Sequence, residues 1–126
     1  MIGTLTMDIE PTAHFRWFLE DGVAVVEVLT RELNNPYYAE EFGAQLQALV
    51  ASRASDRILL NFQHTKSLSS TTCAALFKFA RAASGAGVRV VACGMDPVVR
   101  MGADIASLDE FIPIFDDEPT ARAALQ

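Results

Sequence analysis

The sequence lacks several features that would define a class of protein. It has only two cysteines and two histidines in 126 residues, and no apolar run reaches the roughly 18 residues of a membrane-spanning helix. The N-terminus has no basic segment followed by an apolar core, so we expect no signal peptide. The pattern places both cysteines in the core as free thiols, which is typical of a reducing compartment. We therefore expect a cytoplasmic protein without membrane insertion.

Basic residues and catalytic motifs are also scarce. Ten Lys and Arg residues against 16 Asp and Glu residues give a net charge of −6, which repels phosphate backbones and disfavours direct nucleic-acid binding. There is no glycine-rich phosphate loop and no nucleophile elbow. His14 and His64 do not have the spacing of metal ligands. We expect no cofactor, no metal and no enzymatic activity.

The residues that are present indicate one globular domain. Hydrophobic residues make up 51% and charged residues 21% of the chain, an ordinary balance for a chain of this length. Residues 1–11 carry no clear period and end in Glu10-Pro11. We expect residues 1–11 to form a flexible N-terminal tail and residues 12–126 to form a single domain.

The first half of this domain opens with a predicted hairpin. Apolar and polar residues alternate through Phe15–Leu19, a period that predicts a strand with one buried face. Asp21-Gly22 then separates this strand from the apolar stretch Val23–Leu29. Because Asp-Gly favours the primed turns of two-residue hairpins, these two strands should pair antiparallel.

Buried strands and helices alternate after the hairpin, which predicts an α/β domain with a mixed sheet and about four helices. The expected strands are Ile58–Leu60, Val88–Cys93 and a brief edge strand at Ile112–Phe115. The expected helices begin after Asn35, at the Ser69–Thr72 cluster, at Asp96-Pro97 with an end at Gly102, and at Thr120 with an end at Leu125. Six aromatic residues fit packing in the core: Phe15, Trp17, Phe18, Phe42, Phe77 and Phe79.

Four consecutive hydroxyl residues, Ser69-Ser70-Thr71-Thr72, stand where a buried strand gives way to the central helix. One of them is expected to cap that helix, a contribution of about 1 kcal/mol. The carboxyl edge of an α/β sheet is also where binding sites are usually built. The cluster is therefore both a cap and a candidate site.

These motifs, in this order, resemble the STAS domain family of anti-sigma factor antagonists, stressosome components and cytoplasmic domains of sulphate transporters. The resemblance rests on the strand, serine and helix around Ser70, on Gly87–Gly94 (GVRVVACG) and on Leu108–Asp116 (LDEFIPIFD). The family has an Asp-Ser pair at the helix start and a Gly two positions after the Ser. Here the pair reads Ser69-Ser70 and the Gly position is Thr72.

The resemblance implies a STAS-like mixed sheet and an anti-sigma factor antagonist that regulates transcription in bacterial signalling. Such a protein binds an anti-sigma serine/threonine kinase, which also supplies the ATP, and it is switched off by phosphorylation and reset by a phosphatase. The phosphoacceptor maps onto Ser70, with Ser69 and Thr71 as secondary candidates. The expected partner-binding residues are Lys66, Ser69, Ser70, Thr71, Lys78 and Arg81.

Two alternatives remain open. The first is a STAS binding subunit that works without phosphorylation, as in a stressosome-like scaffold or a lipid-transport complex, and the departures at Ser69 and Thr72 favour it. The second is a small hydrolase or transferase that uses Ser70 with His64 as its base. That alternative requires the two side chains to lie within hydrogen-bond reach.

Overall fold

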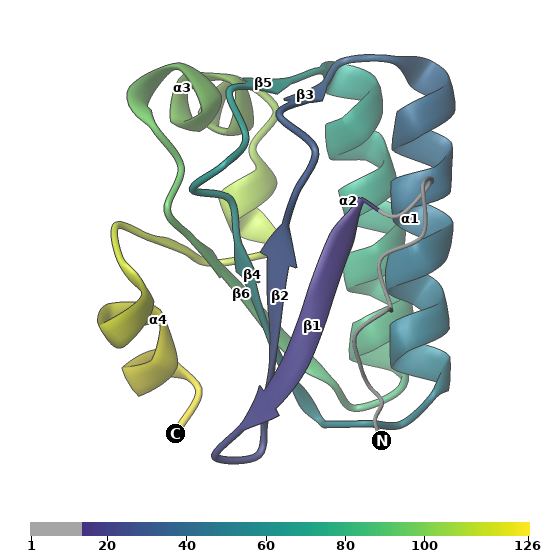
Figure 1. Ribbon diagram of the computed structural model, residues 1–126, viewed down its shortest axis with the longest axis vertical. Coiled ribbons are helices and arrows are strands. Elements are labelled where there is room, and N and C mark those ends of the chain that lie inside the picture. Colours follow the sequence, from purple (N-terminus) through teal and green to yellow (C-terminus); the bar gives the residue numbers. More distant parts are fainter. Residues whose placement is uncertain (1–13) are drawn as a thin grey trace.

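The computed structural model describes residues 14–126, so the expected tail at residues 1–11 lies outside the described residues. The described chain forms a five-stranded sheet in the order β1-β2-β4-β6-β7 and a small separate sheet of β3 and β5 (Figure 1). The strands are β1 (Phe15–Glu20), β2 (Val23–Val28), β3 (Glu32–Leu33), β4 (Arg57–Asn61), β5 (Ser67–Leu68), β6 (Arg89–Cys93) and β7 (Ile114–Phe115). The helices are α1 (Pro36–Ala51), α2 (Ser70–Gly85), α3 (Pro97–Ile105) and α4 (Glu118–Ala124), with a 3₁₀ turn at Leu108–Glu110.

The predicted opening hairpin is confirmed. β1 and β2 pair antiparallel, whereas β2–β4, β4–β6 and β6–β7 pair parallel. Asp21 and Gly22 have φ angles of 53° and 80°, the left-handed geometry of a primed turn. This turn matches the twist of its two strands, so it fixes their register.

Helices α1 and α3 start at the residues that the sequence indicated, whereas α4 starts at Glu118, before the expected Thr120. Asn35 Oδ1 accepts a hydrogen bond of 2.8 Å from the backbone amide of Tyr37, and Asp96 Oδ1 accepts one of 2.9 Å from Val99. Each cap is followed by a proline, which has no amide hydrogen to leave unpaired. The predicted caps of α1 and α3 are therefore confirmed.

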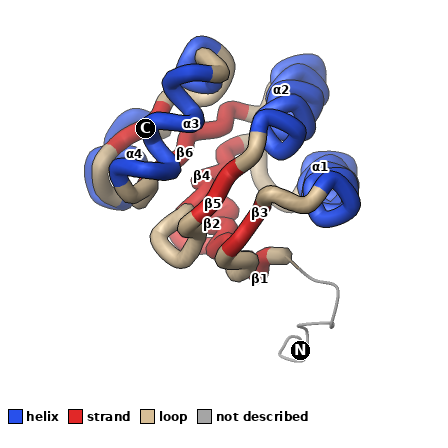
Figure 2. The backbone as a smooth tube through the Cα atoms, turned by 90° about the horizontal axis from the view of Figure 1, so that it is seen from above, coloured by secondary structure: helices blue, strands red, loops and turns tan. Residues whose placement is uncertain are grey.

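The sheet is covered on both faces, as seen along the strands in Figure 2. Helices α1 and α2 pack side by side on one face over a large apolar cluster that includes Phe42, Leu60 and Phe79. The short helix α4 packs on the other face over a smaller cluster that includes Leu59, Val91 and Ala121. The alternation of side chains along β2, β4 and β6 supplies both clusters, so the central residues of these three strands are apolar on both faces of the sheet.

Two expectations about local structure are wrong. Helix α3 does not end at Gly102 but continues to Ile105. A Cβ atom at Gly102 would lie 3.4 Å from the carbonyl oxygen of Leu68, an ordinary contact distance, and Gly102 is an interior residue of the helix that does not terminate it. The second error concerns β1, because Trp17 and Phe18 are exposed and not part of the core.

Candidate functional site

The hydroxyl cluster lies at the carboxyl edge of the sheet, near the top of Figure 1, where β5 leads into α2. A short parallel pairing of β3 with β5 holds this edge together. The amide of Ser69 donates a hydrogen bond of 3.0 Å to the carbonyl oxygen of Leu33. This pairing could not be predicted, because two-residue strands are too short to show a period. It fixes the backbone from which the cluster projects.

Ser69 is the helix cap. Its Oγ accepts a hydrogen bond of 3.2 Å from the backbone amide of Thr72, and Ser69 has the extended backbone of an N-cap residue. The side chain is half-buried. A serine here supplies the acceptor oxygen that a capping aspartate would supply, so the cap survives the change in residue type.

Thr72 is a structural residue. Its side chain is completely buried, and its Oγ1 donates a hydrogen bond of 2.6 Å to the carbonyl oxygen of Leu33. Thr72 Oγ1 also lies 3.1 Å from Ser69 Oγ. Thr72 thus ties the start of α2 to the chain just before α1, and its hydroxyl faces inward.

Ser70 and Thr71 are the two exposed members of the cluster. Ser70 is the first residue of α2, and within residues 14–126 its hydroxyl makes no side-chain hydrogen bond. No hydrogen bond joins it to His64, whose Nε2 instead lies 3.3 Å from Gln63 Nε2 and 3.8 Å from Glu27 Oε2. The pairing required for a Ser70–His64 hydrolase is therefore not formed.

Lys66 connects the cluster to α3. Its Nζ lies 3.7 Å from Asp96 Oδ2, while the other carboxylate oxygen of Asp96 caps α3. One carboxylate thus holds both the loop before α2 and the start of α3. Lys66 thus lies on the same edge of the sheet as Ser70.

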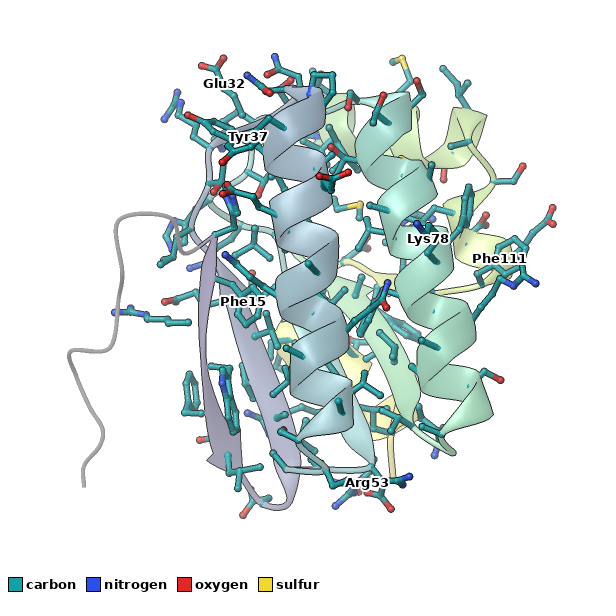
Figure 3. The ribbon with its side chains drawn as sticks, turned by 90° about the vertical axis from the view of Figure 1, so that its right-hand side faces the viewer. Phe15, Glu32, Tyr37, Arg53, Lys78 and Phe111 are labelled. Carbon is teal, nitrogen blue, oxygen red and sulfur yellow. The ribbon has the colours of Figure 1, made fainter. Side chains whose placement is uncertain are left out.

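Lys78 and Arg81 are exposed but lie far from the cluster. Figure 3 shows Lys78 halfway along α2. At the helical rise of 1.5 Å per residue, Lys78 and Arg81 stand about 12 and about 16 Å from Ser70 along the axis. The structure therefore does not bring all the predicted partner-binding residues into one patch.

Sequence reasoning missed an apolar stripe on α3. Val98, Met101 and Ile105 recur at helical spacing and are 69%, 61% and 80% exposed. An exposed apolar stripe of this kind is typical of a protein-binding surface. The exposed apolar face at i, i+3 and i+7 was visible in the sequence, but it was read as a short helix without a role.

Arg31 was also missed. With Leu29, Gln63, His64 and Lys66 it lines an open hollow beside the β3 and β5 segments. The carbonyl oxygen of Arg31 accepts a hydrogen bond of 2.6 Å from the amide of Lys66. Arg31 and Lys66 thus add positive charge to the carboxyl edge of a chain with a net charge of −6.

The two cysteines are buried, as predicted, and His14 is buried as well, which the sequence did not indicate. The His14 ring lies 2.6 Å from Thr30 Oγ1 and 3.0 Å from Glu41 Oε1. Burial raises the pKa of the Cys73 thiol, and burial, with help from Glu118, raises the pKa of Cys93 to about 12. Both cysteines are free. Neither thiol has the low pKa of a nucleophile.

The described part of the chain contains neither a candidate metal site nor a membrane-spanning helix. Residues 14–126 contain no group of His, Cys, Asp and Glu side chains that could hold a metal ion. Among the described helices, none is long and apolar enough to cross a membrane. The carboxyl edge around Ser70 is thus the candidate site.

A mixed sheet with an antiparallel opening hairpin, followed by parallel strands and covered by helices on both faces, defines the class of protein as an α/β domain. The chain belongs to the STAS domain family, whose model matches residues 23–121. No curated protein matches the sequence.

Solved structures share this fold at low sequence identity. A putative anti-sigma factor antagonist of Thermotoga maritima, TM1081, has a TM-score of 0.77 at 18% identity, over 90% of this chain and 95% of that one. The anti-sigma factor antagonist SpoIIAA, in its unphosphorylated form, has a TM-score of 0.69 at 16% identity, over 88% and 96%. Phosphorylated SpoIIAA from Bacillus gives 0.63 at 14% identity, over 89% and 99%. A chain of the stressosome gives 0.66 at 16% identity, over 87% and 95%.

Proposed function

We propose that this protein is an anti-sigma factor antagonist that binds an anti-sigma serine/threonine kinase and is switched off by phosphorylation of Ser70. The observation that supports the proposal is that the hydroxyls of the cluster differ in hydrogen bonding and exposure. Ser69 and Thr72 use their hydroxyls within the fold, whereas Ser70 presents an exposed hydroxyl at the first residue of α2. A kinase can reach it without unfolding the chain.

Charge explains how phosphate at Ser70 would act. A phosphate adds about −1.5 to −2 charges, and the positive end of the α2 dipole accommodates it without strain in the fold. The phosphate should therefore weaken binding of the partner and leave the fold unchanged. The docking surface in this proposal is the carboxyl edge around Ser70, with Lys66, Thr71 and the exposed stripe of α3.

The test is a titration against each purified anti-sigma kinase from the organism that encodes the chain. Ser70→Asp is expected to weaken binding at least about tenfold, a loss of about 1.4 kcal/mol, while Ser70→Ala keeps wild-type affinity and resists phosphorylation. Ser84→Asp, an equally exposed serine at the far end of α2, serves as the matched control and should bind normally. Equal binding by Ser70→Asp and wild type contradicts the proposal.

The second candidate function is a STAS subunit that binds its partners without phosphorylation, in a stressosome-like or lipid-transport complex. The departures at Ser69 and Thr72 favour it. Mass spectrometry of the protein from its own cells, with sites mapped from Lys66 to Lys78, separates the two candidates. Phosphate on Ser70 supports the switch, whereas an unmodified chain under growth and stress, in a large assembly by gel filtration, supports the constitutive subunit.

A further inference from the structure

The edge strand β1 is unusually apolar for its position. It is the first strand of the sheet and pairs with β2 alone among the described strands. Trp17, Phe18 and Leu19 are 40%, 48% and 55% exposed. An exposed apolar edge strand is a template for pairing with another strand, and natural proteins usually protect it.

β1 carries little of the usual protection. The segment Phe15–Glu20 has no proline, no lysine and no glycine that could bulge. Its two charges are neutralised within the chain, because Arg16 forms an ion pair with Glu27 on β2, and Glu20 forms one with Arg122 on α4. Both β1 side chains remain more than half exposed, at 56% and 53%, so a charge of each sign is still accessible to a second strand.

The register of the hairpin shows which backbone groups face outward. The amide of Leu29 donates a hydrogen bond of 2.7 Å to the carbonyl oxygen of His14, so these residues form a hydrogen-bonded pair. Such pairs alternate along an antiparallel ladder, and with Phe15 opposite Val28 the inward-bonding residues of β1 are Arg16, Phe18 and Glu20. The outward N–H and C=O groups therefore belong to Phe15, Trp17 and Leu19.

We propose that the partner of this edge is the β1 strand of a second copy of the chain, in a two-fold antiparallel pair centred on Phe18. The charges select this register among those that satisfy the outward groups. Centred on Phe18, the pairing sets Arg16 opposite Glu20 of the second copy, whereas a pair centred on Arg16 would oppose two arginines. Opposite charges across a strand pair stabilise it and like charges destabilise it.

The same register matches the apolar side chains on both faces. Trp17 and Leu19 lie on the α1 face of the sheet, because their partners Val26 and Ala24 belong to the cluster under α1 and α2. Phe18 lies on the α4 face, opposite Val25. Across the two-fold axis, Trp17 meets Leu19 on one face and the two Phe18 rings meet on the other. The two sheets become one continuous ten-stranded sheet, twice the five strands of each copy.

Sedimentation analysis of the full chain over a range of concentrations tests the pairing. The wild type is expected to show a concentration-dependent dimer, and Phe18→Lys is expected to raise its dissociation constant at least about tenfold, because two lysines would then face each other. Tyr37→Lys, which changes an exposed aromatic residue on α1, is the control and should dimerise normally. A wild-type monomer at every concentration overturns the proposal and leaves residues 1–13 or another protein as the occupant of the edge.

Disulfide trapping tests the register without relying on a destabilising change. Directly opposed residues in a non-hydrogen-bonded pair have Cα atoms about 4.5 Å apart, within disulfide range. Phe18→Cys should therefore cross-link rapidly under mild oxidation, since the native Cys73 and Cys93 are buried. Leu19→Cys is the matched control one position along the strand and should cross-link poorly. Equal cross-linking by both variants, or none by Phe18→Cys, contradicts a pair centred on Phe18.

Discussion

At the start of α2, two adjacent serines place their hydroxyls in different surroundings. Ser69 Oγ accepts from the Thr72 amide, and Ser70 is exposed. Ser69→Ala should therefore lower the free energy of unfolding by about 1 kcal/mol through loss of the cap, and Ser70→Ala should leave it within about 0.5 kcal/mol of wild type. Urea unfolding of both variants measures the difference. An equal loss in both would show that Ser69 is not the cap.

Thr72 allows a second test at the same site. Thr72→Val keeps the shape but removes the hydrogen bond to the Leu33 carbonyl oxygen, and the free energy of unfolding should fall by about 1 to 2 kcal/mol. Thr71→Val, at the exposed neighbour, should change it by less than about 0.5 kcal/mol. Thermal and urea unfolding of the pair would check this. If Thr72→Val left the free energy of unfolding unchanged, the hydrogen bond from α2 to the segment before α1 would contribute nothing to stability.

At the scale of elements, α4 controls the environment of Cys93 on β6. The unfolded thiol loses its proton near pH 9, whereas the folded thiol keeps it to about pH 12. Above pH 9 the unfolded state therefore binds fewer protons than the folded state, so the stability from the buried neutral thiol is complete below pH 9 and is lost as pH rises toward 12. The urea midpoint of the wild type should thus fall more steeply in that range than the midpoint of Cys93→Ala. Parallel curves for the two proteins would contradict this.

Helix α3 is the element that sequence reasoning undervalued. Ile105→Lys changes the most exposed member of its apolar stripe, so the variant should fold as stably as wild type. If α3 forms part of the docking surface, this variant should bind the kinase at least about tenfold more weakly. Ala82→Lys, on the exposed face of α2 far from the carboxyl edge, is the control for added charge. Titration calorimetry on both variants would settle the role of α3.

The elements that the sequence predicted are those with strong local signals. Asn35-Pro36, Asp96-Pro97 and Asp21-Gly22 each fix backbone geometry within two residues, so the helix starts and the hairpin were correct. β3 and β5 could not be predicted, because two residues have no period and their pairing depends on chain segments more than 30 residues apart. The candidate site was predicted from Ser70. The exposed apolar stripe on α3 was not predicted, because the exposure of a side chain depends on how the helix packs against the rest of the chain.

At the scale of the whole molecule, β1 shows where a pattern misleads. Its alternation was read as one buried face, and Phe15 does pack against Phe42, with ring centroids 6.2 Å apart, as seen beside α1 in Figure 3. Trp17 and Leu19 point to the same face but remain exposed. Periodicity gives the orientation of a side chain and not what lies above it. Aromatic residues on an edge strand thus have to be judged after the helices are placed.

The antiparallel direction of two paired β1 strands also decides how many partners one assembly can engage together. Since the strands of the two copies run in opposite directions, the carboxyl edges with their Ser70 residues would point away from each other at opposite ends of the joined sheet. One compact bivalent partner could not reach both, so dimerisation would add no avidity. Each end would bind and be modified independently, and the assembly would act as a two-ended connector between separate kinase molecules.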